Sequence, residues 1–162
     1  MTPDDIGFLT LDRLLRRWGG RLAGCDLVVL SACDTQRRAE VAASDLFLYW
    51  GFYHAGAPTV VASLWRVDDE AAVLLMARFY ENLLGAHDDS REVAGVDHGQ
   101  GQPMTKAQAL VEAKRWIRNA DRRAIRAARE RGGDTNEPTA ATLRPYDDPY
   151  YWAGFVLIGA PD

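Results

Sequence analysis

The sequence predicts an α/β fold with a mostly parallel sheet, because short apolar runs alternate along the chain with segments of helical periodicity. Three runs have the length and composition of buried strands: 26–31, 58–64 and 152–158. Between these runs lie segments whose apolar residues repeat at helical spacing. With 162 residues, the chain has the length of a single domain.

The N-terminal part predicts one helix and one strand. A helix is expected over residues 11–18, with Thr10 or Asp12 as its cap and Gly19-Gly20 as its end. Residues 26–31 follow as the first strand, and a polar loop then continues to about residue 43.

The middle of the chain predicts a second helix and a second strand. Ser44 or Asp45 can cap a helix that ends at Gly56, and residues 58–64 form the strand. The apolar residues expected on this helix are Leu46, Phe47, Trp50 and Tyr53.

Two more helices follow. Asp68 can cap a helix over residues 69–84, and Thr105 can cap a long helix from Lys106 to about Arg131. The expected apolar positions are Val73, Met76, Phe79, Tyr80 and Leu83 in the first, and Ala109, Leu110, Ala113, Trp116 and Ile117 in the second. Polar loop insertions are expected at about 85–104 and 132–148, before the third strand.

Composition and charge argue against a nucleic-acid-binding, membrane-spanning or disulfide-linked protein. The formal net charge of −4 argues against a general affinity for nucleic acid or membranes, and no run approaches the roughly 20 apolar residues of a membrane span. Cys25 and Cys33 flank an extended run, which would hold them too far apart for a disulfide. Two free thiols and no signal peptide favour the cytoplasm.

Topology indicates where a site would lie. In open parallel sheets, ligands bind beyond the carboxyl ends of the strands. Ser31-Ala32-Cys33-Asp34 follows the first strand, and Trp65-Arg66-Val67-Asp68-Asp69 follows the second, so both are expected at the same edge. A free cysteine is more often a small buried hydrophobic residue than a nucleophile, which suits Cys25 better than Cys33.

Several ordered motifs resemble one family. Val28-Val29-Leu30-Ser31-Ala32-Cys33-Asp34-Thr35 is similar to its cysteine motif VVLSACxTG, and residues 55–69 are similar to its AGA..VVASLWxVxD block. Residues 79–83 (FYENL) and 149–159 (PYYWAGFVLIG) resemble the remaining two blocks. On these motifs, which extend from about Leu9 to Gly159, the chain is identified as a member of the CHAT domain family, bacterial relatives of caspases and separases.

The resemblance implies a fold and a chemistry. It implies a caspase-like three-layer sandwich, here a single partial domain over residues 1–162 that lacks one or more N-terminal strands. It also implies regulated proteolysis by a His–Cys dyad with Cys33 as nucleophile, supported by Asp34 and Thr35, and a substrate pocket containing Trp65, Asp68 and Asp69. A carboxylate in that pocket would favour Arg or Lys in the substrate, whereas Arg66 would favour an acidic residue. No cofactor or metal is expected.

The histidine of the dyad has no clear counterpart in this chain. The family's His-Gly precedes a segment similar to Leu9-Thr10-Leu11-Asp12-Arg13-Leu14, and the eight residues before it contain no histidine. Either an upstream domain or companion chain supplies the histidine, or the domain has lost it, and the isolated chain is expected to be inactive. Gln36 also replaces the closing glycine of the cysteine motif.

The three histidines of this chain are weaker candidates for the base. His54 is expected to be a packed or surface residue, and His87 has no supporting context. His98-Gly99 reproduces the His-Gly pair but has no strand before it.

Two alternative functions and a set of partners follow. A non-catalytic protein-interaction module would use the same scaffold without the dyad. A nucleic-acid-binding module would use the arginines of the long helix, although a solvated helix face accounts for them more simply. Those arginines are Arg115, Arg118, Arg122, Arg123, Arg126 and Arg129. The expected partners are a protein or peptide substrate and a helical-repeat sensor module, with no membrane or nucleic acid.

Overall fold

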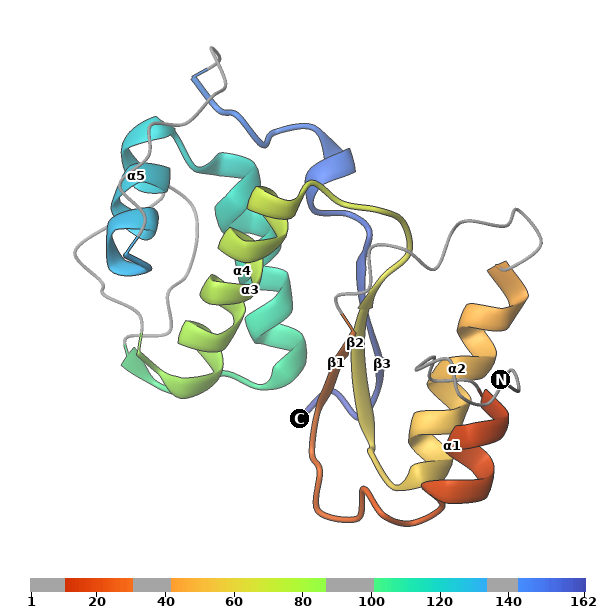
Figure 1. The fold of residues 1–162 in the computed structure, drawn as a ribbon. Coiled ribbons are helices and arrows are strands. Elements are labelled where there is room, and N and C mark those ends of the chain that lie inside the picture. Colours follow the sequence, from red (N-terminus) through yellow and green to blue (C-terminus); the bar gives the residue numbers. More distant parts are fainter. Residues whose placement is uncertain (1–10, 31–41, 87–100, 134–142) are drawn as a thin grey trace. The chain divides into compact units, whose positions relative to one another are not determined.

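The computed structural model describes residues 11–30, 42–86, 101–133 and 143–162, with side chains from Tyr49 onward in the second range (Figure 1). Its contacts divide the chain into two compact units. Unit 1 comprises Met1–Ser63 and Leu157–Ala160, and unit 2 comprises Leu64–Val156 and Pro161–Asp162. The predicted α/β class with a mostly parallel sheet is confirmed.

Unit 1 packs two helices beside the sheet. Its elements are α1 (Leu11–Arg17), β1 (Val28–Leu30), α2 (Ala42–Ala55), β2 (Thr59–Ser63) and the last part of β3 (Phe155–Gly159). The strand order is β1-β2-β3, and β1 pairs with β2 in parallel. One hydrophobic cluster of buried residues in this unit contains Leu14, Tyr49, Phe52, Val60 and Ala62.

Two glycines shape unit 1. A Cβ at Gly51 would lie 2.9 Å from Leu11 Cδ1, so the bare backbone of α2 allows α1 to approach closely. Gly56 ends α2 with φ +107°, a conformation that favours glycine, as the sequence predicted for that position.

Strand β3 runs antiparallel to β2. The backbone N–H of Leu64, just after β2, donates to the carbonyl of Gly154, just before β3, at 2.8 Å. At the other end, the N–H of Ala160 donates to the carbonyl of Pro58 at 3.1 Å. The segment that precedes β3 is therefore paired with the segment that follows β2.

Unit 2 is built around a helix pair. Its elements are α3 (Asp69–Leu84), α4 (Lys106–Asn119), α5 (Arg122–Arg131) and the 3₁₀ helix η3 (Pro149–Tyr151). The predicted cap Thr105 is confirmed and forms a capping box with Gln108. All five apolar residues predicted for the buried face of α4 are buried: Ala109, Leu110, Ala113, Trp116 and Ile117.

A polar network crosses the α3–α4 interface. The guanidinium of Arg78 contacts both carboxylate oxygens of Glu112, at 2.9 to 3.2 Å, and lies 6.0 Å from the ring centroid of Trp116. The Asn82 side-chain amide donates to Glu112 and to the carbonyl of Ala109. Arg78 and Glu112 are only 6% and 5% exposed, so each compensates the other's buried charge.

This network changes the buried face predicted for α3. The residues that face the core are Ala71, Leu74, Leu75, Arg78, Phe79 and Asn82. Of the predicted stripe, Phe79 is fully buried, but Val73 is 68% exposed and Tyr80 44% exposed. The prediction was wrong there because Arg78 and Asn82, although polar, are buried through their bonds to Glu112.

Three predicted element boundaries were also wrong. The helix predicted for 106–131 is two helices, because Ala120 is extended (ψ 125°) and the Asp121 side chain caps a new helix by accepting from the N–H of Ala124 at 2.8 Å. Helix α2 begins at Ala42, so positions 44 and 45, predicted to precede the helix, lie within it. Strand β3 begins at Phe155 and not at Trp152, because residues 152–154 form a turn after η3, in which the N–H groups of Trp152 and Ala153 donate to the carbonyl of Pro149.

None of the helices in the described ranges is both long and apolar enough to cross a bilayer.

Candidate active site

The carboxyl ends of β1 and β2 lie at the same edge of the sheet. The register pairs Val28 with Val60 and Leu30 with Ala62, so the two parallel strands end side by side. Cys33 follows Leu30 by three residues in the sequence. Cys33, Asp34 and Thr35 themselves belong to residues 31–41, outside the described part of the chain.

His54 lies at the other edge of this sheet. It is exposed in the last turn of α2, and the chain then passes through Gly56 to the start of β2 at Thr59. The five residues of β2, at about 3.3 Å each, separate that edge from the one where β1 ends. His54 is therefore a surface histidine, as expected. His87 and His98 lie outside the described residues.

Cys25 precedes β1 and is a free thiol. It is half-buried, and its Sγ lies 3.4 Å from the carbonyl oxygen of Leu27, to which the thiol donates a weak hydrogen bond. This contact and its partial burial fit the expected structural role.

Asp68 has a definite structural role. It is the N-cap of α3, and its carboxylate accepts a hydrogen bond from the N–H of Ala71 at 3.0 Å. Asp69 follows as the first residue of the helix, where a negative charge stabilises the helix dipole. Both side chains are exposed at the start of α3.

Trp65 packs onto the chain before β3. Its indole Nε1–H donates to the carbonyl of Tyr150 at 2.9 Å, and its ring lies against Gly154. The hydroxyl of Tyr150 in turn donates to the carbonyl of Arg66 at 2.7 Å. Trp65, expected in the substrate pocket, therefore has a packing role in the structure. The role of Tyr150 was missed, although the PYYWAGF motif that contains it was noticed in the sequence.

Tyr146 lies near Asp68. Its ring is 6% exposed and meets the ring of Tyr151 edge-on at 5.1 Å. Burial, and next the negative charge of Asp68, raise the pKa of Tyr146 to about 12, whereas Arg129 acts in the opposite direction. Its hydroxyl is therefore protonated at neutral pH.

The CHAT domain family matches residues 1–160. The chain belongs to the CHAT domain family. This family is peptidase-like, which agrees with the resemblance seen in the motifs. No curated protein and no solved structure matches the chain.

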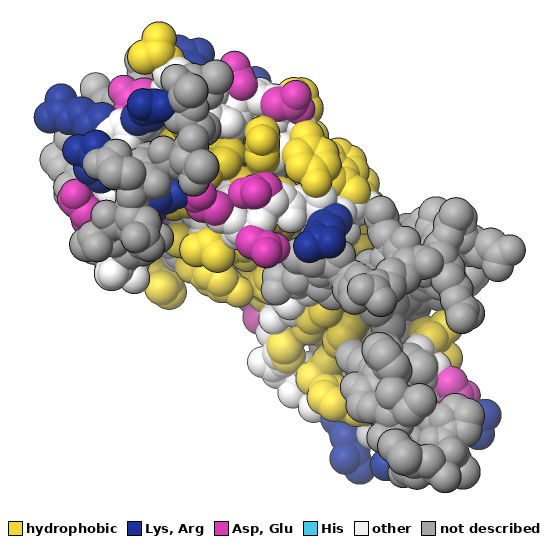
Figure 2. Space-filling model, turned by 45° about the horizontal axis from the view of Figure 1, so that its top comes forward, with side chains coloured by type: hydrophobic (Ala, Val, Ile, Leu, Met, Phe, Trp, Pro, Cys, Tyr) yellow, Lys and Arg dark blue, Asp and Glu magenta, His cyan; other side chains and the backbone are white. Residues whose placement is uncertain are grey.

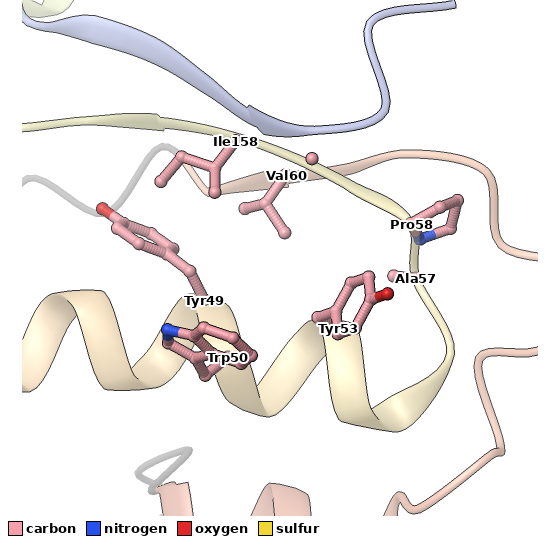
Figure 3. A pocket seen from close by; sticks show the side chains of 8 residues that line it. Tyr49, Trp50, Tyr53, Ala57, Pro58, Val60 and Ile158 are labelled. Atoms are coloured by element: carbon pink, nitrogen blue, oxygen red, sulfur yellow. The ribbon is translucent and has the colours of Figure 1, made fainter.

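The CHAT domain has an apolar pocket of about 350 Å³ in unit 1 (Figure 3). Its lining residues are Tyr49, Trp50 and Tyr53 of α2, Ala57 and Pro58 before β2, Val60 of β2, and Ile158 and Gly159 of β3. Tyr49 and Tyr53 extend from α2 toward the strand residues Val60 and Ile158, and the rings of Trp50 and Tyr53 meet edge-on at 6.2 Å. Among the described lining residues, the titratable groups are the hydroxyls of Tyr49 and Tyr53, and the other side chains are apolar.

The predicted arginines of α4 and α5 are exposed, with the exception of Arg129. Arg129, predicted on the basic face, is 7% exposed and pairs with Glu70. The Arg118 guanidinium lies 5.7 Å from the Trp152 ring centroid. Figure 2 shows basic side chains gathered near α5 with acidic side chains among them. Among the described residues, no His, Cys, Asp or Glu group could hold a metal.

Proposed function

We propose that this CHAT domain carries the nucleophile of a cysteine endopeptidase and that Cys33 is that nucleophile. The observation that supports it most is the parallel pairing of β1 and β2, whose carboxyl ends share one edge of the sheet. The cysteine motif of a peptidase-like family begins in β1 and continues directly from its end.

The proposed reaction proceeds through a thioester. The thiolate sulfur of Cys33 forms a bond to the peptide carbonyl carbon, and backbone N–H groups at the end of β1 stabilise the oxyanion. An imidazole takes the thiol proton and gives it to the leaving amine when the C–N bond breaks. Water then hydrolyses the thioester and releases the second product.

We propose that the imidazole comes from an upstream domain or a companion chain. His54 is separated by the length of β2 from the edge where β1 ends, which supports a base from elsewhere. In a cytoplasmic setting, a helical-repeat sensor module would regulate cleavage of a protein or peptide substrate.

Trp65, Asp68 and Asp69 are the proposed substrate-selecting residues. The carboxylates at the start of α3 would favour a basic residue before the scissile bond, whereas Arg66 would favour an acidic one. Asp68, Asp69 and Arg66 are exposed, which leaves them accessible to a substrate.

The function is tested by cleavage of a fluorogenic peptide library by the protein together with its histidine-supplying segment or partner. Cys33→Ala is expected to lower the rate by at least about 10³-fold. Cys25→Ala is the matched control, because Cys25 is also a free thiol, and it should retain activity. Equal rates for the wild type and Cys33→Ala would contradict the proposal and favour a non-catalytic interaction module.

A further inference from the structure

Two hydrogen bonds tie the segment after β2 to the segment before β3. Trp65 donates through its indole N–H to the carbonyl of Tyr150 at 2.9 Å, and Tyr150 donates through its hydroxyl to the carbonyl of Arg66 at 2.7 Å. The Trp65 side chain is therefore bonded to the backbone of Tyr150, and the Tyr150 side chain is bonded to the backbone of Arg66, which follows Trp65. We call this pair of bonds the Trp65–Tyr150 clamp.

The strand arrangement explains why these segments meet. Because β3 runs antiparallel to β2, the backbone bond from Leu64 to Gly154 brings the start of β3 to the end of β2. Gly154 then leaves room for the indole: a Cβ at this position would lie 2.7 Å from Trp65 Cε2. A side chain at position 154 would force the ring away.

Tyr150 is itself held on its own side of the clamp. It lies in η3, where the Asp148 carboxylate accepts from the N–H of Tyr150 at 2.8 Å. Its ring meets the ring of Tyr151 at 5.5 Å, nearly perpendicular. These two contacts fix the orientation of the Tyr150 side chain, whose hydroxyl bonds to the carbonyl of Arg66.

The other end of the clamped segment is also fixed. Only Val67 separates Arg66 from Asp68, the cap of α3, and Val67 is 3% exposed. Residues 64–68 are thus held by Gly154 at the start, by Tyr150 in the middle and by the helix cap at the end. Of these contacts, only the Tyr150 hydroxyl can be removed without altering the strand pairing, the indole packing or the helix.

We propose that Tyr150 is a positioning residue for substrate selection, because its hydroxyl holds the Trp65–Arg66 backbone in a single conformation. The proposal rests on the proposed peptidase function, in which Trp65 and Asp68 contact the substrate. Tyr150 acts through Arg66 and takes no part in bond breaking. Its loss should therefore weaken substrate binding and leave the chemical step nearly unchanged.

Tyr150→Phe removes this hydroxyl and keeps the ring. Tyr80→Phe is the matched control, because Tyr80 is a similarly exposed tyrosine of the same unit, 44% against 50%, with no hydroxyl bond among the described contacts. Loss of one hydrogen bond predicts a KM raised by about 3- to 10-fold and a kcat within about two-fold. Amide hydrogen exchange over residues 64–67 should also become faster in Tyr150→Phe and not in Tyr80→Phe.

The outcomes separate this proposal from the function on which it depends. Faster exchange together with a raised KM supports positioning by Tyr150. Faster exchange with an unchanged KM, or unchanged exchange, overturns it and leaves the peptidase proposal standing. A wild-type protein that cleaves no peptide overturns the proposed function, and the exchange data then report a structural clamp alone.

Discussion

At the scale of single residues, Asp68 combines a helix-capping role with a proposed role in substrate recognition, and substitutions can separate the two. As the cap of α3 it accepts from the N–H of Ala71, and asparagine caps a helix about as well as aspartate. As a proposed recognition group for a basic substrate residue it needs its negative charge. Asparagine therefore keeps the first role and removes the second.

We expect Asp68→Ala to lower the free energy of unfolding by about 1 kcal/mol and Asp68→Asn to change it little. In peptide cleavage, both variants should shift the residue preferred before the scissile bond away from Arg and Lys. Urea unfolding and library cleavage measure the two effects. If Asp68→Asn cleaves the same peptides as the wild type, Asp68 is a helix cap only.

At the scale of helices and strands, the features predicted best from the sequence are those that depend on residues close together in the chain, such as helix caps and apolar faces. The caps at Asp68 and Thr105 bond to groups three residues away, and the buried face of α4 follows from apolar spacing. The buried face of α3 was misjudged because Arg78 meets Glu112, 34 residues away. Such a pair looks solvent-exposed in a sequence, since burial of each charge depends on a partner in another element.

The break between α4 and α5 can be tested by whether Asp121→Ala stabilises or destabilises the protein. In a continuous helix, Asp121 would be interior, and Asp121→Ala would stabilise the protein because alanine has the higher helix propensity. As the cap of α5, Asp121 donates nothing and accepts from Ala124, so its loss should cost about 1 kcal/mol.

Thermal or urea unfolding of Asp121→Ala measures this difference, with Asp121→Asn as the control that keeps the cap. We expect alanine to destabilise and asparagine to be nearly neutral. A more stable Asp121→Ala variant would show that residues 106–131 behave as one helix.

At the scale of the whole molecule, the alternation of strands and helices predicted the α/β class, and ordered motifs predicted the family. Two features were not predictable from local patterns. The antiparallel direction of β3 depends on pairing between residues about 90 to 100 positions apart. The division into two units falls where β2 ends, at Ser63, and inside β3.

In the candidate site, too, local motifs were predicted from the sequence and contacts between distant residues were not. Motif order predicted Cys33 and the segment from Trp65 to Asp69, and the structure gives Asp68 and Trp65 defined structural contacts. The hydrogen bond from Tyr150 to Arg66 was not predicted, because it spans 84 residues and requires the antiparallel β3.

The most direct test of the central claim is the pH dependence of alkylation of Cys33. Iodoacetamide labelling, quantified at each cysteine by peptide mass spectrometry, is measured in the protein together with its histidine-supplying segment or partner. We predict that Cys33 reacts with an apparent pKa well below the ordinary value of about 8.5, faster at neutral pH than Cys25 in the same molecule. An apparent pKa for Cys33 near 8.5 would contradict its activation as a nucleophile.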